Sequence, residues 1–220
     1  MTALLRQITP STGAVFGLSC MIALLVVLTS LVFTNDTYAL FREGGPIEGM
    51  SAAFWFVAAL WLSVYLIRQR RGALWHLAVL LWAAGMRELD MDKAYTQDGI
   101  LQLRLYSGDA PALQKLIGAA IVLLILTAAI RLLIRDLPGF LRRIPALRAN
   151  EWLVILIIEL LFISKSIDGL GRKLAPFGVE ISDWTSDFAG RAEEAMELFA
   201  AILVLQVVVL GVRRAAQRLT

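Results

Sequence analysis

Long apolar runs alternate with short polar segments along the whole of this 220-residue chain. Several of the runs reach the roughly 20 residues that an α-helix needs to cross the hydrocarbon core of a bilayer. The pattern predicts six transmembrane helices, at about 14–34, 47–67, 73–93, 112–134, 151–170 and 186–213. We therefore expect an all-α fold, a polytopic integral membrane helical bundle in which residues 1–220 form a single transmembrane domain.

Composition and charge support this prediction. Hydrophobic residues make up 59% of the chain, above the about 45–50% that is usual in soluble domains. Most arginines fall in the alternate segments 68–71, 131–148 and 213–218, and such segments face the cytoplasm. We therefore expect a bacterial inner membrane protein with both termini and the Arg-rich loops in the cytoplasm. The net charge of +3 then reflects orientation and anionic lipid headgroups, so the expected partners are membrane lipids and not nucleic acid.

The later helices are too short for the membrane. In the helix at 73–93 the apolar part between Arg71 and Arg87 has 15 residues, which make about 22 Å of helix against a hydrocarbon core of about 30 Å. The helices at 112–134 and 186–213 show the same shortfall. Their charged ends must lie below the membrane surface, where ionisable groups usually face a polar interior. We expect one shared, carboxylate-rich cavity open to the outer, periplasmic face.

The acids of this cavity fall into two groups according to which end of a helix carries them. Acids at the outer amino-terminal ends of helices are favoured by the helix dipole and need no further partner. Glu88, Asp90, Asp92 and Asp168 are predicted at outer carboxyl-terminal ends, against the dipole. Basic side chains or a bound cation must therefore compensate these four acids.

Helical spacing predicts which side chains meet. Glu88 and Asp92 are four residues apart and should share a face, as should Glu193 and Glu197. Three-residue spacings allow ion pairs of Asp90 with Arg87 or Lys93, and of Lys165 with Asp168. These pairs predict an interhelical salt-bridge network as the plain structural alternative to a functional site.

A carboxylate cluster without histidine or cysteine suits hard cations such as Mg, Ca or Mn. Such a cation would orient a lipid headgroup at the outer leaflet for binding or processing. The predicted metal ligands are Glu88, Asp92, Asp168 and Glu197, and the first three would also be catalytic if the protein is an enzyme, which stays open. The predicted ligand-binding residues are Arg87, Asp90, Lys115, Lys165, Glu193 and Glu197.

Other cofactors are not expected. The single Cys20 and the single His76 exclude an Fe–S cluster and a bis-His haem within one chain. The sequence carries no nucleotide-binding motif. His76 lies near the cytoplasmic end of its helix, where we expect a structural role.

Two other functions fit the same residues. The first is a small proton- or cation-coupled transporter or channel, with Glu159 as a proton relay at the floor of the cavity. Glu159 has a plainer interpretation as well, a carboxyl group that hydrogen-bonds across a helix contact. The second is a non-catalytic subunit, either in a homo-oligomer or in a larger membrane complex.

Overall fold

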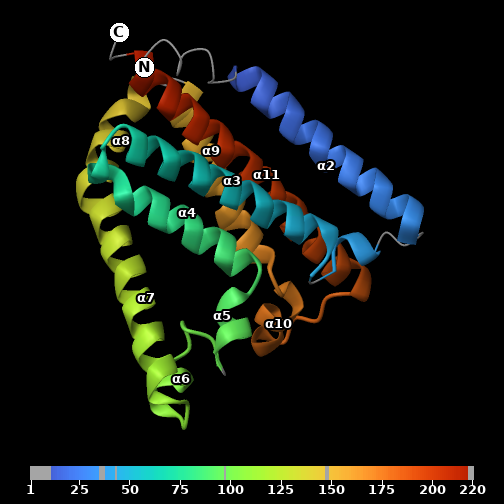
Figure 1. Ribbon diagram of the computed structural model, residues 1–220. Helices are drawn as coiled ribbons and strands as arrows, with labels where there is room; N and C mark the ends of the chain where they lie inside the picture. The colour runs from blue at the N-terminus through green and yellow to red at the C-terminus, as the bar shows by residue number, and fades with distance from the viewer. Residues whose placement is uncertain (1–10, 35–37, 43, 97, 147–148, 218–220) are drawn as a thin grey trace.

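The computed structural model describes residues 11–34, 38–42, 44–96, 98–146 and 149–217. These residues form helices, turns and short loops without a β-strand, which confirms the predicted all-α class. Figure 1 shows the long helices as a bundle, with α2 along one edge and α7 splayed away at the other.

The centre of the bundle is the contact between α3 (Pro46–Arg68) and α11 (Asp183–Gln217), the most extensive contact among the described elements. Ala58 of α3 and Ala201 of α11 have no exposed surface and belong to the same buried cluster. Small side chains allow two helix backbones to approach closely in a membrane. The α3–α11 contact therefore sets the position of everything attached to these two helices.

Two antiparallel hairpins meet at this contact. In the first, α4 (Trp75–Glu88) packs against α3 after a turn in which Arg70 has a φ of 50°. In the second, α9 (Ala149–Ile167) packs against α11. The order across the bundle is α9, α11, α3 and α4, so residues at the same depth on the two hairpins can face each other.

The two remaining long helices flank the hairpins. On one side α2 (Thr12–Thr34) packs against α11 and α3. The side-chain amide of Gln206 in α11 anchors the start of α2, because it donates to Thr12 O at 2.8 Å and accepts from Phe16 N at 3.2 Å. On the other side α7 (Ala112–Arg131) packs against α4.

The other described elements are short and lie between the long helices. They are η1 (Tyr38–Leu40), η2 (Gly72–Leu74), α5 (Met91–Tyr95), α6 (Leu103–Ser107), the π-helical η3 (Leu132–Asp136), α8 (Leu137–Arg143), η4 (Ile144–Ala146), α10 (Leu170–Leu174) and η5 (Ala175–Phe177).

Four of the described helical stretches are long and apolar enough to cross a membrane, so the chain has the character of an integral membrane protein. The stretches are Thr12–Phe33, Pro46–Arg68, Ala112–Ala146 and Asp183–Ala215. The helices α4 and α9 do not meet the same criterion, since α4 has 14 residues and α9 carries three charged residues. The structure therefore supports four of the six predicted spans directly.

Three of the predicted helix boundaries are wrong. The helix predicted at 73–93 breaks after Glu88, because Asp90 adopts a left-handed conformation with a φ of 46°. The helix predicted at 151–170 ends at Ile167, before the left-handed Gly169. The helix predicted at 112–134 continues through η3 and α8 into a segment that the sequence predicted to be a loop.

The two ends of the bundle differ in charge. We call the end that carries Glu88 and Glu197 the glutamate end, and the opposite end, which carries Arg68 and Arg213, the arginine end.

Candidate functional site

Charged and hydroxyl side chains gather at the glutamate end, where the two hairpins meet. Four helices contribute to this glutamate cluster, which consists of Glu48 and Ser51 from α3, Glu88 from α4, Ser164 and Lys165 from α9, and Glu193, Glu194 and Glu197 from α11. Each helix delivers its residues in the last or first turns of its apolar run. The shortness of those runs therefore places the charges inside the bundle and not beyond it.

Each hairpin holds one serine–glutamate pair. In the α3–α4 hairpin the Ser51 hydroxyl donates a hydrogen bond to Glu88 Oε1. In the α9–α11 hairpin the Ser164 hydroxyl donates to Glu197 Oε1 at 2.7 Å. Both serines are buried, so neither hydroxyl has water as an alternative partner. The two bonds therefore fix one carboxylate to each hairpin in a corresponding position.

Lys165 adds a cation to the second hairpin. Its Nζ atom lies 2.6 Å from Glu197 Oε1 and 3.2 Å from Glu193 Oε1. Glu193 and Glu197 thus share a face of α11, as their spacing predicts. The predicted ion pair of Lys165 with Asp168 is wrong, because α9 ends at Ile167 and leaves Asp168 outside the helix.

Like charges face each other across the contact between the hairpins. Glu88 of the first hairpin lies within electrostatic range of Glu197 and Lys165 of the second. Glu194 of the second hairpin lies within range of Glu48 and Glu88 of the first. Carboxylates within electrostatic range of each other in a partly buried site repel unless a proton or cation lies between them, and Lys165 supplies one such cation. The geometry therefore favours a group that takes up protons or cations.

The Asp92 side of the predicted cavity is built differently. The break after Glu88 places Asp92 in α5, so Glu88 and Asp92 do not share a helix face as predicted. The carboxylate of Asp90 accepts hydrogen bonds from Arg87 and Lys93, both at 2.6 Å, and this predicted pairing is confirmed. Asp92 Oδ1 is buried without a hydrogen-bond partner among the described residues.

Three further predicted residues lie at the edge of the cluster or away from it. Asp168 lies 4.0 Å from Arg172 and within electrostatic range of Glu193, at the exposed edge of the cluster. Lys115 donates to Gly108 O at 2.7 Å and so closes the turn before α7. Glu159 lies on the exposed face of α9, not on the face that carries Ser164.

The predicted metal ligands are not brought together. Within the described ranges, no group of three or more His, Cys, Asp or Glu residues is placed to hold a metal ion. Glu88 and Glu197 lie near each other, but Asp92 belongs to α5 and Asp168 to the turn after α9. The observed arrangement is thus a set of separated carboxylates, of which Glu88 and Glu197 have hydrogen-bond partners within their hairpins and Asp168 lies near Arg172.

Sequence reasoning did not predict the hydrogen bonds of Ser51 and Ser164 to glutamates, and it left Glu194 out of the site. Ser51 follows Glu48 by three residues and Ser164 directly precedes Lys165. A small hydroxyl residue next to a charge in an otherwise apolar helix is a usable signal, because its hydroxyl needs a partner within the bundle. The partner itself lies on another helix, so the sequence alone does not identify it.

Comparison of the chain with protein-family models, with curated proteins and with solved structures found no match.

Proposed function

We propose that this protein is a small proton- or cation-coupled membrane transporter, with the glutamate cluster as its coupling site. The observation that carries the proposal is the excess of acids where the hairpins meet, since Glu88 and Glu48 lie within electrostatic range of Glu197 and Glu194 and Lys165 is the one lysine of the cluster. An arrangement that only held the bundle together would alternate acids with bases. This arrangement instead makes the closeness of the hairpins depend on what the carboxylates bind.

The proposed topology has six membrane-spanning helices, α2, α3, α4, α7, α9 and α11. The 14 residues of α4 extend about 21 Å, so the cluster lies below the surface of a bilayer whose core is about 30 Å thick. The arginine end faces the cytoplasm by the positive-inside rule, which puts the cluster near the periplasmic face of a bacterial inner membrane. Both termini are then cytoplasmic.

A serine–glutamate hydrogen bond joins the two helices within each hairpin, and glutamates of the two hairpins repel each other. The Ser51–Glu88 and Ser164–Glu197 bonds keep each carboxylate on its own hairpin. A proton or cation bound between Glu88 and Glu197 draws the hairpins together, and its release lets them separate. Two arrangements of rigid halves around a fixed polar site are what alternating access requires.

Lys165 acts as a tethered cation in this scheme. Its ammonium group lies between Glu193 and Glu197, at the position that an incoming cation would take. More than half of the Lys165 side-chain surface is exposed, so the side chain has room to move away from Glu197. Lys165 and an external cation then compete for the same carboxylates. Cation binding is thereby coupled to the distance between the two hairpins.

Flux measurements in liposomes test the proposal. Purified protein is reconstituted, and proton uptake is followed with an internal pH dye under imposed Na⁺ or K⁺ gradients. We expect cation- or pH-driven proton flux that Glu88→Gln and Glu197→Gln each reduce at least tenfold. The matched control is Asp187→Asn, since Asp187 is an exposed acid of the same α11 helix. Equal flux in the wild type, both cluster variants and empty liposomes would refute the transporter.

The binding or processing of a lipid headgroup with a divalent cation remains a second candidate. The unpartnered, buried Oδ1 of Asp92 supports it, because a buried carboxylate oxygen without a protein donor has a free position for a cation or a water. The metal content of purified protein, before and after Asp92→Asn, tests this candidate. Bound Mg, Ca or Mn that the substitution removes would support it. If the purified protein contains no metal and the liposomes show no flux, the interpretation that is left is a non-catalytic subunit of a larger membrane complex.

A further inference from the structure

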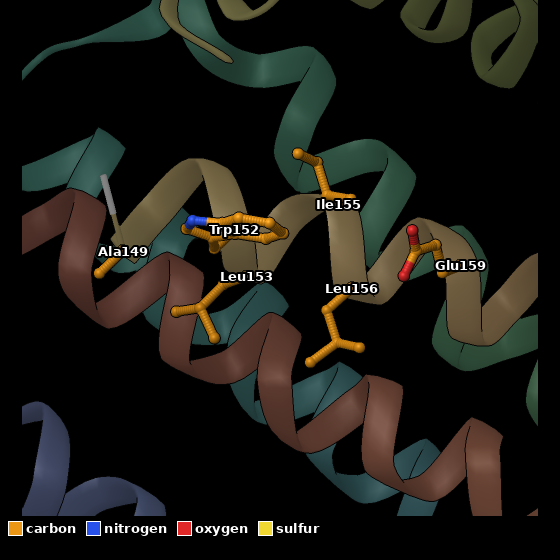
Figure 2. Close-up of a pocket in the computed structure, with 6 residues that line it drawn as sticks. All are labelled: Ala149, Trp152, Leu153, Ile155, Leu156 and Glu159. Atoms are coloured by element: carbon orange, nitrogen blue, oxygen red, sulfur yellow. The ribbon is translucent and has the colours of Figure 1, made fainter. Parts of the chain in front are cut away.

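The outward face of α9 carries a groove of about 400 Å³, lined by Ala149, Trp152, Leu153, Ile155, Leu156 and Glu159. Figure 2 shows these side chains along one stretch of the helix, with Ala149 at one end, Glu159 at the other and the Trp152 ring between them. The groove lies outside the glutamate cluster, and the proposed coupling chemistry does not use it.

Glu159 is a charged residue of this face without a partner in the described part of the chain. The other ionisable groups of α9 are paired, since Glu151 lies 3.3 Å from Arg143 and Lys165 contacts Glu193 and Glu197. Neither a hydrogen bond nor an ion pair joins Glu159 to a described residue. Glu159 lies about 12 Å along the axis from Glu151, at a depth where lipid chains offer no donor or acceptor.

The exposed side chains around Glu159 form a straight seam. Trp152, Leu156, Glu159 and Ile163 follow one another at spacings of four, three and four residues, and all four are exposed. This 3.5-residue repeat is the pattern by which two helices pack along their length. A single polar residue in such a seam fixes the register and the number of helices.

A carboxyl group is its own best partner in an apolar seam. When one of two facing carboxyls carries a proton, that group has a donor and the other offers acceptors. Two copies inserted in the same membrane have the same orientation, so a two-fold axis along the membrane normal places two α9 helices parallel and in register. Each seam residue then meets its own counterpart, Glu159 included.

We infer that the α9 seam is the interface of a homodimer, in which Glu159 hydrogen-bonds to Glu159 of a second copy. Trp152 and Leu156 of each copy fill the groove of the other. The inference rests on the proposed crossing of the membrane by α9, but it does not require transport. The dimer therefore stands or falls separately from the flux measurements above.

Cysteine cross-linking in membranes tests the register. The chain has one cysteine, so Cys20→Ser gives a clean background. In this background Leu156→Cys should form a disulfide-linked dimer under copper–phenanthroline oxidation. The matched control is Ile158→Cys, because Ile158 lies two residues further along α9, is more exposed than Leu156 and stands outside the seam. Equal cross-linking at both positions, or none at Leu156→Cys, would overturn the inference.

Charge exchange at Glu159 tests the chemistry. Glu159→Gln keeps a donor and an acceptor, so the dimer measured by light scattering in detergent should persist. Glu159→Lys sets two like charges together and should lower the association constant at least about tenfold. Co-expression of the wild type with Glu159→Lys should restore a mixed dimer through a Glu–Lys pair. A lipid-filled groove or a foreign partner helix predicts monomers of the wild type, and that result would overturn the inference.

Discussion

The two ends of the bundle differ in how their charged side chains are arranged. At the arginine end Asp136 and Glu151 each have a basic or hydrogen-bonding partner, since His76 Nε2 lies 2.7 Å from Asp136 Oδ2 and Arg143 Nε lies 3.3 Å from Glu151 Oε1. At the glutamate end five glutamates gather on three helices. Opposite charges that pair one to one fix the positions of helices. Like charges brought together lower stability, so their retention points to function.

The contrast extends to the elements that each end connects. The His76–Asp136 bond joins α4 to the π-helical η3, and Arg131 and Arg135 both donate to Ala73 O in the turn before α4. These contacts hold the splayed α7 to the first hairpin. At the glutamate end the hydrogen bonds of the serines stay within single hairpins. The arginine end is therefore cross-linked between helices, whereas at the glutamate end the serine hydrogen bonds do not cross from one hairpin to the other.

The largest expected loss of stability is at the arginine end. His76 has no exposed surface, so His76→Ala removes the bond to Asp136 and leaves a cavity. We expect a loss of about 3 kcal/mol in the free energy of unfolding, measured by denaturant unfolding in detergent micelles. A change like that of the exposed control Asp187→Asn would show that this cross-link does not stabilise the bundle.

The next largest effect is expected at Lys165. Lys165→Met keeps the length of the side chain but leaves Glu193 and Glu197 without their cation. Because the lysine is more than half exposed, we expect a loss of about 1 to 2 kcal/mol in the free energy of unfolding. Adding Glu197→Gln should recover part of the loss, because it removes one of the two uncompensated charges and the one that lies nearer to Lys165. A double variant no more stable than Lys165→Met would contradict the cluster geometry.

The sequence was sufficient to predict at which end of each helix the charges lie. Counting apolar residues between Arg71 and Arg87 places Glu88 at the end of an apolar helix, and the same count places Glu197 at the start of the apolar run of α11. The pairing of Asp90 followed from local spacing, because Arg87 and Lys93 both lie three residues from it. Position within a helix and local contacts depend only on position along the chain.

Contacts between helices could not be predicted from the sequence. The i,i+3 rule predicted Lys165 with Asp168, but it holds only while the helix continues, and α9 ends between them. Asp92 was lost from the site for the same reason, because Asp90 adopts a left-handed conformation and turns the chain. The serine partners depend on the α3–α4 and α9–α11 packing, which periodicity does not fix.

The two hairpins should respond equally to loss of their serines. Ser51→Ala and Ser164→Ala each remove one hydrogen bond from a glutamate, and both hydroxyls are buried. We expect each substitution to lower the free energy of unfolding by about 1 kcal/mol, measured by the same denaturant unfolding. A much larger effect of one serine would show that the hairpins are not equivalent supports of the cluster.

The smallest expected effect has the most informative sign. Glu194 interacts with four other glutamates, so Glu194→Gln removes repulsion and should raise the free energy of unfolding by about 0.5 to 1 kcal/mol. The matched substitution at the other end is Glu151→Gln, which deprives Arg143 of its partner and should lower the free energy by about 1 kcal/mol. Both changes replace a carboxylate with an amide of the same size, so the sign of each effect reports the charges around the carboxylate, although Glu151 is the more buried of the two. If Glu194→Gln stabilises and Glu151→Gln destabilises the protein, the carboxylates of the glutamate end repel each other and that of the arginine end is attracted to its partner. If both substitutions destabilise alike, the glutamate cluster is a salt-bridge network like the arginine end, and its function must be sought elsewhere in the chain.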